Sequence, residues 1–61
     1  MREHDVRSLT ADELERARRE LAASLALVRP ESPMRVPIIA HMSAIDTEQA
    51  DRERIARASR S

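Results

Sequence analysis

Apolar residues recur every three or four positions between residues 14 and 28, which is the spacing of one face of an α-helix. Pro30 follows this stripe, and a proline disfavours the helical conformation of the residue before it. We therefore predict a first helix over about residues 11–29, whose inward face is formed by Leu14, Ala17, Leu21, Leu25 and Val28.

The start of this helix is marked by a capping box. Thr10 and Glu13 have the spacing at which the threonine hydroxyl accepts from the Glu13 N–H and the glutamate reaches back to the Thr10 N–H. Leu9 and Leu14 occupy the positions of a hydrophobic staple. These residues predict that the chain enters the helix directly after Thr10.

A second apolar stripe follows a proline-rich segment. Pro30, Pro33 and Pro37 lie within eight positions and rule out one continuous helix. We expect a connector over residues 30–36 and a second helix over about 37–57, which begins at the last of these prolines. Its apolar face consists of Ile38, Ile39, Met42 and Ile45.

These stripes predict an all-α fold, a two-helix antiparallel hairpin over residues 9–58. Residues 1–8 are expected to form a mobile tail, and residues 59–61 the C-terminal tail. Antiparallel pairing places Val28 by Ile38, Leu25 by Met42 and Leu21 by Ile45. Farther from the turn Leu14 approaches Arg52, so we expect an apolar turn half, firm over residues 20–46, and a polar open end.

Two features do not fit an isolated hairpin. Leu27 and Ile39 lie off the main seams, and a second hairpin packed face to face would cover both in a four-helix bundle. Arg18 lies beside the seam; we expect its head to reach Glu48 or solvent, and the alternative is a role in register or partner choice. The predicted core and interface residues are Leu14, Leu21, Leu25, Leu27, Val28, Ile38, Ile39, Met42 and Ile45.

Composition strengthens the argument for association. The chain has 61 residues, no cysteine and no aromatic residue. A chain of about this size buries only ~60% of the surface that it exposes when unfolded. Small domains compensate with disulfides, metals or oligomerisation, and neither cysteines nor a set of metal ligands are present here. Self-association, most simply as a homodimer, is the remaining source of stability.

The charges are balanced, with eleven acidic residues and eleven arginines. A net charge of zero argues against bulk electrostatic binding to nucleic acid or membrane. Residues 52–61 carry four arginines and one glutamate, which gives an alternative use as a small nucleic-acid-binding regulator. No aromatic residue is available to stack on bases, which weighs against this alternative.

No residue pattern indicates catalysis. His41 has no HExxH context and is interpreted as a surface or interface histidine. Ser24, Ser32 and Ser43 lack a glycine-flanked nucleophile turn. We predict no catalytic, cofactor-binding or metal-binding residues, and hence no enzyme. The apolar runs are too short to span a bilayer and no secretory signal is visible, so the cytoplasm is the expected location.

The stretches Leu14–Leu27 and Arg35–Asp46, with the proline-rich turn between them, resemble a group of small actinobacterial helical-hairpin proteins of unknown function. The resemblance covers about residues 9–50 and implies no activity or site residue. Together with the pattern it predicts a non-catalytic interaction module that self-associates, with use as a regulator or adaptor of a protein partner. A further alternative is an antitoxin-like inhibitor whose helices order on its target.

Overall fold

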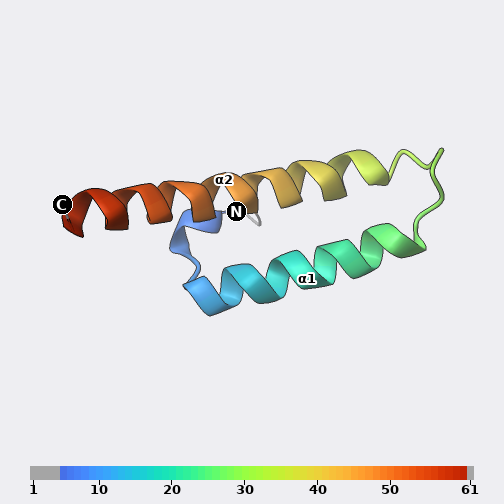
Figure 1. Ribbon diagram of the computed structural model, residues 1–61. Helices are drawn as coiled ribbons and strands as arrows, with labels where there is room; N and C mark the ends of the chain where they lie inside the picture. Colours follow the sequence, from blue (N-terminus) through green and yellow to red (C-terminus); the bar gives the residue numbers. More distant parts are fainter. Residues whose placement is uncertain (1–4, 61) are drawn as a thin grey trace.

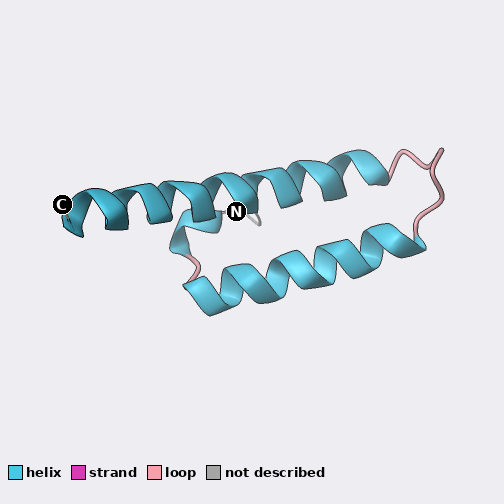
Figure 2. Cartoon of the chain, viewed as in Figure 1, coloured by secondary structure: helices cyan, strands magenta, loops and turns pink. Residues whose placement is uncertain are grey.

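Two antiparallel helices lie side by side in the computed structural model, which describes residues 5–60 (Figure 1). A short 3-10 helix, η1 (Val6–Ser8), precedes α1 (Ala11–Leu27) and α2 (Arg35–Arg60). No strand occurs within residues 5–60 (Figure 2). The prediction of an all-α two-helix hairpin is confirmed.

The capping box at the start of α1 is also confirmed. The hydroxyl of Thr10 accepts from the Glu13 N–H at 3.1 Å, and the Glu13 carboxylate accepts from the Thr10 N–H at 2.8 Å. Asp12 and Glu13 place negative charge at the positive end of the helix dipole. The first turn is therefore stabilised by contacts local to the sequence.

The connector has the expected length but lies two positions earlier, over residues 28–34, because α1 ends at Leu27, two residues before the predicted end. Val28 is extended, and its N–H bonds the Leu25 carbonyl at 3.2 Å. Ser32 organises the rest of the turn, because its N–H bonds the Arg29 carbonyl at 3.0 Å and its hydroxyl accepts from the Met34 N–H at 3.2 Å. No described residue has a positive φ, so the chain reverses without glycine.

The second helix begins at Arg35, two residues before the expected Pro37, and continues to Arg60. Pro37 is its third residue and lies in the first turn. The backbone N–H groups of a first turn have no acceptor within the helix, so the N–H that proline lacks costs no helical hydrogen bond there. The Pro33 carbonyl, four residues before Pro37, accepts from the Val36 N–H at 3.3 Å. Pro37 is therefore compatible with a helix that starts before it.

The interior of the hairpin is small. Leu14 and Ile45 are the only described side chains that are fully buried, each at 0% exposure. The other seam residues are half-buried, namely Leu21, Leu25, Val28, Ile38 and Met42. The prediction that the open end of the hairpin is polar is therefore wrong in one respect, because Leu14 lies near that end and is fully buried.

The chain is elongated as well as thin. Its dimensions are 46 × 25 × 16 Å and its radius of gyration is 13.5 Å. A compact domain of this length would have a radius of gyration of about 10.5 Å. Most residues therefore belong to a surface, and the features that can carry function lie there.

Candidate interaction surfaces

The described residues form no enclosed cavity. Within residues 5–60 no group of three histidine or acidic side chains could hold a metal ion. No helix in that range has the length and apolarity needed to cross a membrane. The candidate functional features are therefore the polar clusters and exposed faces of the hairpin.

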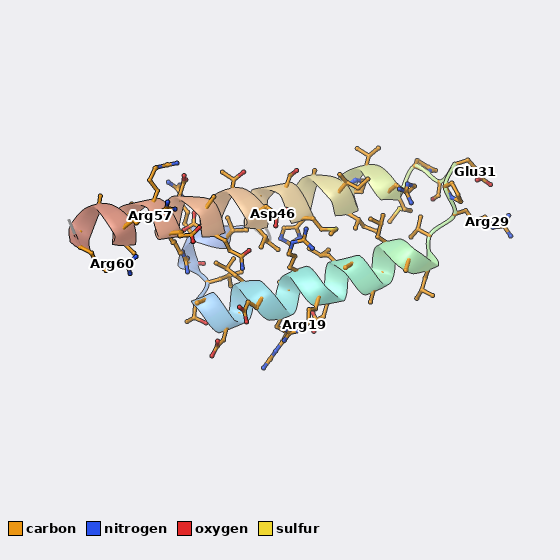
Figure 3. The ribbon with its side chains drawn as sticks, in the orientation of Figure 1. Arg19, Arg29, Glu31, Asp46, Arg57 and Arg60 are labelled. Atoms are coloured by element: carbon orange, nitrogen blue, oxygen red, sulfur yellow. The ribbon has the colours of Figure 1, made fainter. Side chains whose placement is uncertain are left out.

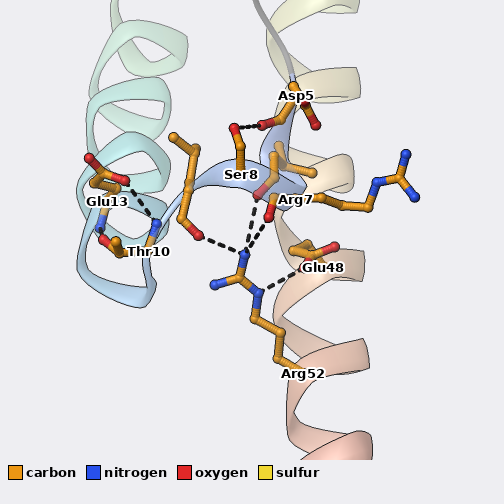
Figure 4. Close-up of polar contacts among 9 residues, drawn as sticks. Asp5, Arg7, Ser8, Thr10, Glu13, Glu48 and Arg52 are labelled. Atoms are coloured by element: carbon orange, nitrogen blue, oxygen red, sulfur yellow. Dashed lines mark hydrogen bonds and ion pairs between the residues drawn. The ribbon is translucent and has the colours of Figure 1, made fainter.

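Arg52 joins α2 to the segment before α1 (Figure 4). Its Nη2 donates to the backbone carbonyls of Leu9 at 2.6 Å, Arg7 at 3.3 Å and Val6 at 3.4 Å. Its Nε donates to the Glu48 carboxylate at 2.7 Å, one helical turn earlier. We call Arg52, Glu48 and these three carbonyls the Arg52 clamp.

The clamp corrects the prediction of a mobile tail over residues 1–8. Residues 1–4 lie outside the described range, but Val6–Ser8 form η1 and pack against α2 at the open end of the hairpin (Figures 1 and 4). Val6 and Leu9 are half-buried there. No residue pattern in the sequence marks these three carbonyls as partners of the Arg52 guanidinium.

A second polar contact joins the two helices directly. Arg18 donates from Nε to one Asp46 carboxylate oxygen at 2.6 Å and from Nη2 to the other at 3.2 Å. The expected partner of Arg18, Glu48, is bound to Arg52 instead. Side chains two positions apart on a helix are rotated by about 200° around its axis, so Asp46 and Glu48 lie on different sides of α2.

The Arg18–Asp46 pair shifts the pKa of both groups towards their charged forms. The hydrogen bond from Arg18 holds the pKa of the Asp46 carboxyl below its usual range, and the same bond raises the pKa of Arg18. Both side chains remain about half exposed, at 41% and 50%. The pair therefore fixes the register of the helices while keeping contact with solvent.

We predict that Asp46→Asn makes the protein less stable at neutral pH. Because the Asp46 pKa is lowered in the folded state, its contribution is present above the unfolded carboxyl pKa of about 3.9 and is lost as the pH falls through the folded value. Urea unfolding of both proteins should therefore differ at neutral pH and converge in acid. Glu20→Gln, an exposed and unpaired carboxylate among the described residues, is the control. A difference that persists in acid would contradict the prediction.

The end of α2 extends past α1 (Figure 1). Residues 53–60, which we call the overhang, are all exposed, and Figure 3 shows Arg57 and Arg60 on this segment. Arg54 pairs with Asp51, and Arg57 lies 3.7 Å from Glu53. The positive charge predicted for the C-terminal end is therefore partly offset by carboxylates on the same helix.

The turn half of the hairpin has one apolar side. Because Arg18 and Asp46 meet on one side, residues one and two turns nearer the connector lie on that side as well. From Arg18 these are Ala22 and Ala26, both exposed; from Asp46 they are Met42, half-buried, and Ile39, 44% exposed. We call these four residues, with the adjoining Leu25, the apolar side.

The opposite side of the same half carries polar residues together with the exposed Leu27, which lies one turn beyond Ser24. Glu20 and Ser24 are each two residues from Ala22, and His41 is two residues from Ile39, so all three point away from the apolar side. The other exposed large hydrophobic residues are Leu27, Met34 and Val36 near the turn and Ile55 on the overhang.

Comparisons with protein-family models, with curated proteins and with solved structures gave no significant match. The resemblance to small actinobacterial proteins therefore stays a prediction. The fold and its contacts define a two-helix hairpin whose N-terminal segment is held by an arginine clamp.

Proposed function

We propose that this chain is a non-catalytic helical interaction module that self-associates as a homodimer and forms a four-helix bundle. The supporting observation is its exposed area of 5017 Å². A compact chain of 6.9 kDa would expose about 4000 Å², so the excess is about 1000 Å². A standard interface buries ~800 Å² of each partner, which is comparable to this excess.

The distribution of apolar residues supports the same proposal. Only two side chains among the described residues are fully buried, whereas five large hydrophobic ones are 44% exposed or more. Three of the five, Leu27, Met34 and Val36, lie near the turn, and apolar residues that gather on a surface are typical of proteins that bind other proteins. The net charge of zero also means that two copies do not repel each other over long distances.

A dimer would suit the role of a regulator or adaptor. Each copy contributes one exposed overhang, so a pair presents two equivalent arms to a protein partner. Binding through both arms gains from effective concentration without any new contact. This is the sense in which we propose that the module acts on a partner.

The test is sedimentation of the full chain over a wide range of micromolar concentrations. We expect a species of twice the 6.9 kDa chain mass, with helical circular dichroism that persists on dilution until the dimer dissociates. A cooperatively folded monomer at every concentration would overturn the proposal. Weak helicity of the isolated chain would instead favour an inhibitor that orders on its target.

A second candidate, a nucleic-acid-binding regulator, is favoured only by the exposed overhang and its three arginines. It requires that duplex binding falls steeply with salt and is lost when Arg54, Arg57 and Arg60 are all replaced by glutamine. The pairing of Arg54 and Arg57 with carboxylates makes this candidate the weaker one. Absence of binding to any duplex at low salt would end it.

A further inference from the structure

We infer that the second copy docks on the apolar side, about a two-fold axis that runs parallel to the long axis of the hairpin. This inference rests on the self-association proposed above and adds its surface and symmetry. In this arrangement turn lies beside turn, and α1 of each copy lies over α2 of the other.

The register of the hairpin gives the first argument. One turn from the Arg18–Asp46 pair, Ala22 of α1 and Met42 of α2 lie at the same level, and one turn farther Ala26 lies level with Ile39. A two-fold axis along the helices therefore places each alanine opposite a large side chain of the second copy. Small residues facing large ones allow the two layers to interdigitate.

The other way to pack the two apolar sides is less complementary. A two-fold axis perpendicular to the helices, in the plane between the copies, would place α1 of one copy over α1 of the other and α2 over α2. Alanines would then face alanines, and Ile39 and Met42 would face the same two large residues of the second copy. This packing leaves gaps on one side and crowding on the other, both of which cost stability.

Charge gives an independent argument for the parallel axis. With α1 over α2, Arg18 of each copy lies above Asp46 of the other, so two ion pairs join into a network of four alternating charges. Both side chains are about half exposed and have hydrogen-bonding capacity left for a second partner. With the axis across the helices, these pairs would not meet.

Elsewhere in residues 5–60 the exposed large hydrophobic residues are divided between the turn, with Leu27, Met34 and Val36, and the overhang, with Ile55. The side opposite the apolar side carries Glu20, Ser24 and His41, and the open end is occupied by η1 and the Arg52 clamp. A symmetric dimer needs a self-complementary patch, and the arginine-rich overhang would meet its own charge. The apolar side is the remaining surface that fits a second copy.

Ala22→Arg tests the surface, with Ala40→Arg as its matched control. Ala22 is exposed, so the single hairpin should tolerate the arginine, whereas the dimer would have to bury an unpaired charge. Ala40 is also exposed and lies about 200° around α2 from Met42. In sedimentation we expect Ala22→Arg to raise the dissociation constant of the dimer at least thirtyfold, because burying an unpaired charge opposes association. Ala40→Arg should leave this dissociation constant nearly unchanged.

Cysteine cross-linking tests the axis, because the chain has no cysteine of its own. Ala26→Cys protein mixed with Ile39→Cys protein should oxidise mainly to the mixed disulfide. Ready cross-linking of Ala26→Cys to itself, or no cross-link in a dimer that persists, would overturn the inferred axis.

The outcomes separate the two proposals. A wild-type chain that stays monomeric overturns the proposed self-association and this inference with it. A wild-type dimer that Ala22→Arg leaves intact overturns only the docking surface. A dimer that Ala40→Arg disrupts equally would also contradict the inferred surface.

Discussion

Replacing Ile45 with alanine should lower the free energy of unfolding by about 2–5 kcal/mol, the range measured for large aliphatic residues in protein cores. Ile45 is fully buried, and the only other fully buried described side chain is Leu14. A chain of this length has a total stability of about 3–9 kcal/mol, so this loss would remove much of it. Urea unfolding followed by circular dichroism, at one fixed protein concentration, measures the change.

Leu27→Ala is the matched control for this substitution. Leu27 is 88% exposed in the single hairpin and lies off the apolar side, so its truncation should change stability by less than about 0.5 kcal/mol. Leu14→Ala should behave like Ile45→Ala. If Leu27→Ala were as damaging as Ile45→Ala, the small interior described above would not be the source of stability.

Arg52→Met should release the segment before α1 and cost about 1.5–3 kcal/mol, the range for hydrogen bonds that involve a charged group. Methionine keeps much of the aliphatic stem but removes the guanidinium that donates to the carbonyls of Val6, Arg7 and Leu9. The chain around Arg7 should then open, and tryptic cleavage after this residue should become faster. Brief proteolysis followed by mass spectrometry gives the local effect, and urea unfolding gives the global one.

Arg54→Met is the control for the clamp. Arg54 is on the same helix, but its contact is an exposed pair with Asp51. We expect no change in cleavage after Arg7 and a stability change of at most about 1 kcal/mol. Equal cleavage rates after Arg7 in the Arg52→Met variant and the wild type would show that the clamp does not hold the segment.

Much of the hairpin could be predicted because its signals are local. Periodic apolar residues, the Thr10–Glu13 capping box and a proline after Val28 each act over one or two helical turns. The start of α2 was less predictable, because Pro37 is acceptable at either the first or the third helical position. The bonds around Ser32 and Pro33 decide between these positions, and they depend on the path of the connector.

The contacts between distant segments could not be predicted in the same way. The Arg52 clamp binds backbone carbonyls, which every residue has, so no side-chain pattern marks residues 6–9 as its partners. The partner of Arg18 depended on the rotation of α2, so the sequence pointed to Glu48, whereas Asp46 is the carboxylate that Arg18 binds. The apolar side could be recognised only once this pair had fixed which faces of the two helices coincide.

The unequal lengths of the two helices have a practical consequence for labelling. Anything fused before Asp5 would begin a few residues from the Arg52 clamp and could pull η1 from its place. A group fused after the overhang follows an exposed helical segment. Each added helical residue would place the fused group about 1.5 Å farther from the hairpin. Fluorophores and affinity tags therefore belong at the carboxyl end.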